Sequence, residues 1–193
     1  MAHFMRHGAL FWLLFWIWLV LEIAFAARAR RLRTNGTRRT YRDRGSAAAI
    51  VLGMYVLLAI TFWFASNRFG FLPVWTRWVG LVLMASGIVI RFSAIRQLGR
   101  FFSPLVNVAE DQQIIQTGWY RHIRHPAYTG GWITAVGIAL SLRTWWGAVL
   151  CGVGLFLLYL YRIHVEEQAL VDHFGEPYRS YMKRTKRMFP GVW

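Results

Sequence analysis

The sequence predicts an all-α integral membrane protein of about five transmembrane helices that ends in a helical hairpin. Hydrophobic residues make up 56% of the 193-residue chain. They are gathered in runs close to the ~20 residues that a helix needs to cross a bilayer, and most charged residues lie between these runs. The runs leave too little polar sequence for a second domain, so we expect residues 1–193 to form a single membrane domain.

Five apolar runs define the predicted spans, which are about 9–27, 47–65, 72–95, 127–142 and 145–161. The last two are short and are joined only by Arg143 and Thr144, which predicts a tight helical hairpin. The first run resembles a secretory signal with a cleavage-like site at Ala26. Because this run is long and aromatic, with Glu22 just before that site, we predict an uncleaved helix instead.

The cations are distributed unevenly between the two sides of the predicted bundle. With an odd number of spans, seventeen Lys and Arg residues fall on the side of the C-terminus, within 28–46, 96–124 and 179–187. The other side receives four, namely Arg6, Arg68, Arg77 and Arg143. Since the side richer in cations stays in the cytoplasm, we expect the N-terminus outside and the C-terminus inside.

The composition also excludes several partners. A net charge of +15 would suggest nucleic acid in a soluble chain. Here the cations lie in loops, where anionic lipid headgroups account for them, and no nucleic-acid partner is predicted. The single cysteine, Cys151, excludes an internal disulfide and a multi-cysteine metal site. The histidines near the hairpin lack such support, so no metal is predicted.

Two polar clusters flank the hydrophobic hairpin. The first is Arg124-His125-Pro126-Ala127-Tyr128-Thr129-Gly130, and the second runs from Arg162 to Gln168 and on through 174–178. A helical hairpin returns the chain to the side it left, so the clusters should meet at one membrane face. Pro126 suits the first turn of a helix. The N-terminus of this helix would favour a carboxylate or phosphate. Alternatively, the cations are only the positive charges that commonly precede a membrane span.

The second cluster carries an acidic pair, Glu166 and Glu167, in a chain with eight acidic residues. Arg162 and Glu166 are four residues apart and share one helical face. They are either a solvated helix end with a salt bridge or part of a functional site. Ionisable residues at the edge of a membrane span commonly mark functional sites. Arg91, inside the third span, either lines such a site or extends to the cytoplasmic face.

A long polar segment, about 97–128, connects the third and fourth spans. The alternation at Val106-Asn107-Val108 predicts a short extended strand, and Thr117-Gly118 predicts a turn. Together with residues 162–193, this segment would lie at the cytoplasmic ends of the helices. It is either a plain surface loop or a cover that folds back over those ends.

The ordered set of motifs resembles the isoprenylcysteine carboxyl methyltransferase family, whose wider relatives are phospholipid N-methyltransferases. The resemblance covers about the C-terminal half of the chain. It rests on the following residues: Thr117-Gly118-x-Tyr120, Arg124-His125-Pro126-x-Tyr128-x-Gly130, Arg162-x-x-x-Glu166-Glu167-x-x-Leu170 and Phe174-Gly175-x-x-Tyr178-x-x-Tyr181.

This resemblance implies a cytoplasmic binding site for S-adenosylmethionine (SAM) and a lipophilic carboxylate substrate that enters from the bilayer. The residues implied to bind the cofactor are Gln112, Gln113, Ile114, Ile115, Tyr120, His125, Pro126, Ala127, Tyr128, Glu166 and Glu167. Arg162 and Glu166 would be catalytic, and Arg162 and Arg91 would contact the substrate. Family members often have His where this chain has Gln112, which makes that cofactor contact less secure.

The chemistry fits these residues. A carboxylate is already ionised at neutral pH, so its methylation needs no general base, covalent nucleophile or metal. Three alternatives remain. A methyltransferase acting on an amine lipid would use the same cofactor site. A nicotinamide-dependent sterol-type reductase ends in a similar hairpin, but Ala127 and Gly131-Trp132 differ from the residues typical of that class at these positions. The last alternative is a small basic membrane protein with no activity.

Overall fold

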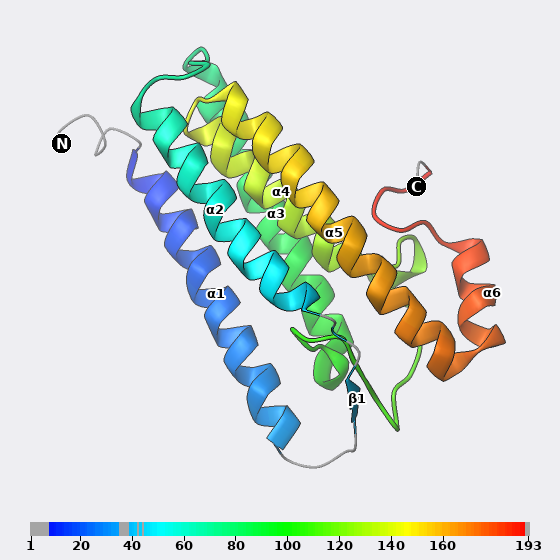
Figure 1. The fold of residues 1–193 in the computed structure, drawn as a ribbon. Helices are drawn as coiled ribbons and strands as arrows, with labels where there is room; N and C mark the ends of the chain where they lie inside the picture. The colour runs from blue at the N-terminus through cyan, green and yellow to red at the C-terminus, as the bar shows by residue number, and fades with distance from the viewer. Residues whose placement is uncertain (1–7, 35–38, 42, 44, 192–193) are drawn as a thin grey trace.

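The computed structural model describes residues 8–34, 39–41, 43 and 45–191. Five long helices lie alongside one another (Figure 1). They are α1 (Gly8–Thr34), α2 (Ser46–Ser66), α3 (Trp75–Leu98), α4 (Pro126–Ser141) and α5 (Trp145–Phe174). All but α4 are long and apolar enough to cross a membrane. The all-α membrane fold is therefore confirmed, whereas the count of five spans stays a prediction because α4 has 16 residues, about 24 Å.

The helix ends follow local sequence signals. Pro126 occupies the first turn of α4, and Thr144 caps α5 by accepting a hydrogen bond from the backbone N–H of Gly147 at 3.2 Å. The predicted tight hairpin is confirmed, with Arg143 in a left-handed conformation between the two helices. Helix α5 continues well beyond Tyr161, so the part of the second cluster from Arg162 to Gln168 is helical. It ends at Gly175, whose φ of 64° lets the chain turn into α6 (Glu176–Arg184).

The connections lie at two opposite ends of the bundle (Figure 1). At one end the α4–α5 turn contacts the α2–α3 loop, where Arg143 Nε donates to the carbonyl of Leu72 at 2.9 Å. At the other end β1 (Arg39–Tyr41) pairs antiparallel with β2 (Asn107–Ala109). The strand predicted around Val108 is thus confirmed, and its partner comes from the α1–α2 connection. Two short 3₁₀ helices, Gly99–Phe101 and Gly118–Arg121, complete this end.

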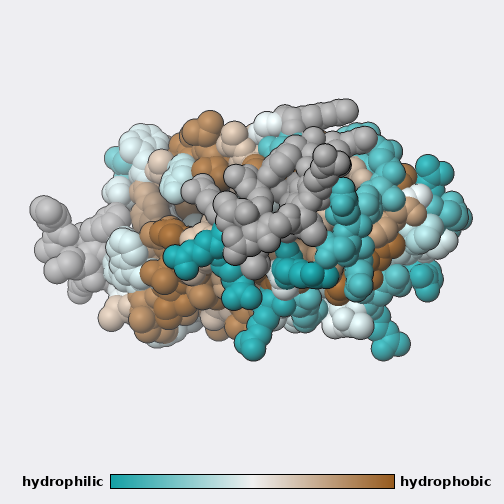
Figure 2. All heavy atoms as spheres, turned by 90° about the horizontal axis from the view of Figure 1, so that it is seen from below, coloured by the Kyte–Doolittle hydropathy of each residue, from teal (hydrophilic) through white to brown (hydrophobic). Residues whose placement is uncertain are grey.

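Hydrophilic residues gather at the end that carries β1 and α6. Seen from this end, they are concentrated on the side where α6 lies (Figure 2). The cation-rich segments of the sequence all reach this end, whereas Arg68, Arg77 and Arg143 belong to the opposite end. Four of the counted cations, Arg6, Arg38, Arg42 and Arg44, lie outside the described residues.

Helices α3 and α4 approach so closely that glycines are required between them. A Cβ atom added to Gly137 would lie 2.5 Å from the backbone nitrogen of Met84, and one added to Gly130 would lie 2.4 Å from that of Arg91. Small residues allow such backbone contact between membrane helices. Most of α4 is buried as a result, and the first polar cluster is fixed against α3.

We expect Gly137→Ala to destabilise the folded protein by about 1–3 kcal/mol, because the new methyl group meets backbone that cannot move away. The matched control is Gly152→Ala in α5, where the added Cβ would make only ordinary contacts at 3.8 Å or more. Thermal unfolding in detergent would compare the two variants. Equal melting temperatures would contradict the close packing of α3 on α4.

Candidate functional site

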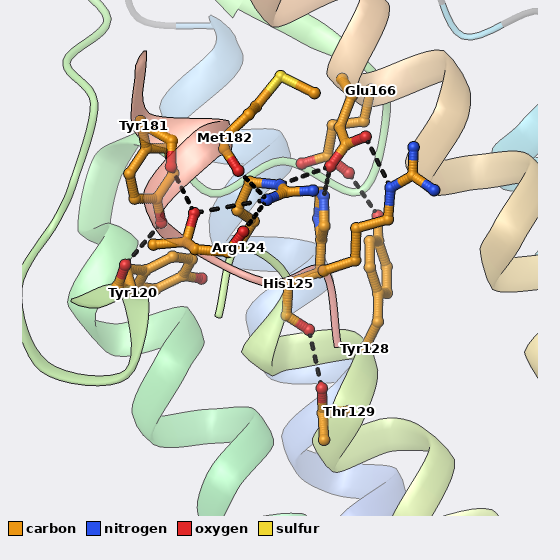
Figure 3. Close-up of polar contacts among 11 residues, drawn as sticks. Tyr120, Arg124, His125, Tyr128, Thr129, Glu166, Tyr181 and Met182 are labelled. Carbon is orange, nitrogen blue, oxygen red and sulfur yellow. Dashed lines mark hydrogen bonds and ion pairs between the residues drawn. The ribbon is translucent and has the colours of Figure 1, made fainter. Parts of the chain in front are cut away.

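The two polar clusters meet where α4 begins and α5 approaches its end, as predicted. The side chains of His125, Tyr128 and Glu166 point toward one another (Figure 3). The hydroxyl of Tyr128 donates to Glu166 Oε2 at 2.7 Å, and the rings of His125 and Tyr128 stack at 5.6 Å. Glu166 is half-buried, and its second carboxylate oxygen has no partner among the described residues. An acidic group beside aromatic faces is suited to a cationic ligand.

Glu167, the neighbour of Glu166, is the hub of a buried ionic network. Its Oε1 accepts from Arg124 Nε at 2.7 Å and lies 3.3 Å from His125 Nε2, and its Oε2 accepts from Arg187 Nε at 3.0 Å. Only 4% of Glu167 is exposed, so this charge is stable only because it is paired and hydrogen-bonded. Both carboxylate oxygens of Glu167 therefore have protein partners, and its predicted contact with the cofactor stays a prediction.

The segment after α6 lies across the start of α4. The backbone N–H groups of Arg124 and His125 donate to the carbonyls of Lys186 and Arg187 at 2.8 and 2.9 Å. The hydroxyl of Thr129 donates to the carbonyl of Met188 at 2.8 Å. Two of the N–H groups around this helix start are thus used by the chain itself, which leaves less of the anion-binding capacity expected from the sequence.

Arg162 is buried and surrounded by protein acceptors. It forms a salt bridge with Asp43, and it donates to Ser46 Oγ at 2.6 Å and to the carbonyl of Pro104 at 2.7 Å. Its Nε donates to the hydroxyl of Tyr128 at 3.2 Å. A substrate carboxylate would have to displace Asp43 from this guanidinium. The direct role of Arg162 in substrate binding stays a prediction.

Asp43 also fixes the connection between α1 and α2. It accepts hydrogen bonds from the backbone N–H groups of Val106 at 3.0 Å and Ala47 at 3.1 Å. Partial burial raises the pKa of this carboxyl, but these two N–H groups and the charge of Arg162 outweigh burial and hold its pKa below the usual value. Asp43 therefore ties the residue before β2, the start of α2 and α5 together in its ionised form.

Arg91 is paired with a carboxylate inside the apolar part of the bundle. Its Nε and Nη2 donate to the two oxygens of Glu22 in α1 at 2.5 and 2.9 Å, and its Nη1 donates to the carbonyl of Ala127 at 2.9 Å. Arg91 thus touches the first polar cluster. Of the two alternatives for this residue, the geometry favours lining the site over extending to the surface.

The remaining predicted cofactor residues are less closely joined to the cluster. Within the described residues, Gln112–Ile115 makes no hydrogen bond to His125, Tyr128 or Glu166, and Gln112 instead accepts from the N–H of Ala109 at 3.4 Å. Tyr120 is buried, and its carbonyl accepts from the hydroxyl of Tyr181 at 2.6 Å (Figure 3). Burial raises the pKa of Tyr181 to about 12, so this hydroxyl remains a donor at neutral pH.

Three residues of these networks were not singled out from the sequence as site residues: Glu22, Asp43 and Arg187. The sequence feature that could have identified these residues is the scarcity of acidic residues. With eight Asp and Glu residues against 23 Lys and Arg, a carboxylate in an apolar run needs a buried cation as a partner. Which arginine each acid meets depends on the fold and could not be read from spacing.

The fold and site define an integral membrane protein of the helical class, with a polar site at the end of its terminal hairpin. Residues 75–177 match the phospholipid methyltransferase family. The chain belongs to this family, and the resemblance based on the motifs is confirmed.

Similar proteins include the protein-S-isoprenylcysteine O-methyltransferases of Dictyostelium discoideum and Schizosaccharomyces pombe. The first is 29% identical over 69% of this chain and 57% of its own length, and the second is 32% identical over 57% and 48%. The chain thus spans about half the length of these relatives. A similar solved structure is that of the eukaryotic intramembrane Ras methyltransferase ICMT, with a TM-score of 0.59 and 24% identity over 75% of this chain and 52% of that chain.

We expect Glu167→Gln to release the segment after α6, because a neutral amide cannot compensate Arg124, His125 and Arg187 together. Hydrogen exchange at the amides of Arg124 and His125 should become at least tenfold faster, since their acceptors lie on that segment. Glu176→Gln is the control, because its contact with Lys183 is long, at 3.9 Å, and exposed. Unchanged protection in Glu167→Gln would contradict the role of the hub.

The lowered pKa of Asp43 predicts a loss of stability in acid. The ionised carboxylate stabilises the folded state fully above its unfolded pKa, near 3.8, and this contribution is lost as the pH falls through the lower folded value. Asp43→Asn should therefore show a smaller drop in melting temperature between about pH 5 and pH 3 than the wild type does. Asp111→Asn, which removes an exposed partner of Arg100, should leave the drop unchanged.

Proposed function

We propose that this protein is a SAM-dependent methyltransferase that methylates the carboxylate of an isoprenylcysteine-like or other lipophilic substrate. The observation that carries the proposal is the contact of Tyr128 with Glu166, beside buried arginines at one end of a bundle of membrane helices. The relatives named above act on S-isoprenylcysteine, which joins a carboxylate to a lipid chain. The cation-rich end of the bundle supports a cytoplasmic site, with the N-terminus outside.

The residues present fit SAM, which carries a sulfonium and an ammonium group. Glu166 offers one carboxylate oxygen without a partner, and His125 and Tyr128 offer aromatic faces beside it. Pro126 and Ala127 would contribute backbone between them. Tyr120 and Gln112–Ile115 would complete the pocket from the neighbouring loop, and Glu167 would act by holding His125 in place.

When bound, SAM supplies a methyl group that an ionised carboxylate accepts without loss of a proton. The protein must therefore position the acceptor and exclude water, and no general base is required. Arginine suits this task because its planar guanidinium holds a carboxylate through two hydrogen bonds. Arg162 fixes the hydroxyl of Tyr128, and Arg91 lies beside Ala127 with a carboxylate already on it.

A second candidate is methylation of an amine lipid, and the description of the matched family favours it. An amine must lose a proton before it can accept a methyl group, and His125, whose Nε2 lies 3.3 Å from Glu167, is the base that the cluster offers. The two reactions give products that alkali separates. A carboxyl methyl ester releases volatile methanol, whereas a methylated amine does not.

The direct test incubates the purified protein with methyl-labelled SAM and two acceptors in separate reactions, an S-farnesylcysteine carboxylate and an amine-headed phospholipid. Label that becomes volatile in alkali is the expected result. Label that stays in the lipid fraction after alkali would point to the amine reaction, and the absence of transfer to either acceptor would contradict the proposal.

We expect Glu166→Gln to raise the KM for SAM by about tenfold or more, because loss of one charge-assisted contact costs at least ~1.4 kcal/mol. The change keeps the shape of the side chain and the bond from Tyr128. Glu176→Gln, an exposed acid on α6, serves as the control. An unchanged KM for SAM in Glu166→Gln would remove Glu166 from the cofactor site.

A further inference from the structure

The Glu22–Arg91 pair is a two-point carboxylate–guanidinium contact within helices that cross the membrane. Glu22 lies in the span of α1 and Arg91 in that of α3. The pair is not sealed, because the side chains of Arg91 and Glu22 are 15% and 28% exposed. Ionised groups at such depth are costly and mark functional sites by default. The contact has the geometry with which arginine would hold a substrate carboxylate.

The two halves of the pair are held very differently. Arg91 is on α3, whose backbone packs directly on Gly130 of α4. Glu22 is on α1, which lies at the edge of the bundle (Figure 1) and has only Phe11 and Trp18 buried among its described side chains. Apart from Arg91, Glu22 accepts a hydrogen bond from the indole of Trp18 at 3.2 Å. Glu22 is therefore held by fewer protein contacts than Arg91, and it is the more exposed member of the pair.

Arg162, which is paired with Asp43, does not offer this freedom. The side chain of Arg162 is 4% exposed, and its partner Asp43 also accepts hydrogen bonds from the N–H groups of Ala47 in α2 and of Val106 before β2. Displacing Asp43 would break those bonds as well. Exchange of one carboxylate for another is thus much easier at Arg91.

An apolar cavity adjoins the pair between α1 and α3. It has a volume of about 450 Å³ and begins about one helical turn from Glu22 and Arg91. Its lining residues are Ala24, Phe25, Arg28, Ile95, Arg96, Gly99 and Phe102. An apolar chain fits the lining that Ala24, Phe25, Ile95 and Phe102 provide, and Arg91 lies one helical turn beyond Ile95 for its anionic head.

Arg91 also lies next to the aromatic side chains of the proposed cofactor site. A Cβ atom added to Gly131 would lie 3.2 Å from Arg91 Nη1 and 2.6 Å from the hydroxyl of Tyr159. The ring of Tyr159 contacts that of Tyr128 at 4.8 Å, and Tyr128 bonds Glu166. A carboxylate on Arg91 is therefore on the side of the bundle where the cluster lies.

We propose that Glu22 is a specificity-determining residue that occupies Arg91 as an internal carboxylate and is exchanged for the carboxylate of the acceptor. This inference rests on the proposed function and narrows its substrate to amphiphiles with a carboxylate head. A neutral or amine-headed lipid cannot replace Glu22, because it leaves the guanidinium without a counter-charge. A carboxylate can replace it with no net change in the charge of the pair.

The test measures equilibrium binding of labelled N-acetyl-S-farnesylcysteine and of its primary amide to the full-length protein in lipid nanodiscs, without SAM. Glu22→Gln removes the competing charge, so it should bind the carboxylate probe at least tenfold more tightly and the amide unchanged. The double variant Glu22→Gln/Arg91→Gln should lose the preference for the carboxylate. Asp111→Asn, which removes the exposed ion pair between Asp111 and Arg100, should leave both affinities unchanged.

Glu22→Asp is a second test variant, measured in the same binding assay, and it keeps the negative charge in the span. Its shorter side chain cannot make both bonds to Arg91, so carboxylate binding should tighten by a smaller factor than in Glu22→Gln. Equal or weaker carboxylate binding in both variants would overturn the exchange. Binding requires no methyl transfer, so tightening in a protein that transfers no methyl group would refute the proposed function alone. Methyl transfer that is insensitive to Glu22 would refute the exchange alone.

Discussion

The buried carboxylate of Glu167 joins three parts of the chain that are distant in sequence. It binds Arg124 and His125 at the start of α4 and Arg187 beyond α6, and it is itself on α5. Removing the Glu167 carboxylate would leave the buried Arg124 without its carboxylate partner, and a buried charge without compensation is among the most destabilising changes in a protein. The positions of His125, Tyr128 and Glu166 depend on this network, because it fixes α4, α5 and the C-terminal segment relative to one another.

The same shortage of acidic residues organises the rest of the interior. Arg162 and Arg91 each have a single carboxylate partner, Asp43 and Glu22. Both acids precede residues 75–177, the part that matches the family. The N-terminal part of the chain therefore does more than anchor it in the bilayer, because α1 and the α1–α2 connection provide the counter-charges of Arg91 and Arg162. A chain with few acids can use each one both to stabilise the fold and to set the chemistry of a binding site.

Much of this arrangement could be predicted from the sequence. Apolar runs gave the helices, and the short link at Arg143-Thr144 required a hairpin that brings the two clusters together. The alternation around Val108 indicated a strand, but its partner in the α1–α2 connection depends on a long-range contact that no local pattern encodes. The partners of Arg162, Arg91 and Glu167 were unpredictable for the same reason. Spacing shows which residues share a helical face, and it does not show which other helix packs on that face.

The glycines illustrate the limit more sharply. Gly130 could be recognised as part of a motif. The physical reason why this position needs a glycine is the backbone of α3 at Arg91, about forty residues earlier in the chain. That contact brings a guanidinium to the carbonyl of Ala127.

The central claim is that the two clusters form one cofactor site for SAM. Equilibrium dialysis of the purified wild-type protein against labelled SAM, with and without excess NADPH, tests it most directly. Our account predicts saturable binding of about one SAM per chain that NADPH does not displace. Absence of saturable SAM binding, or its displacement by NADPH, would contradict it.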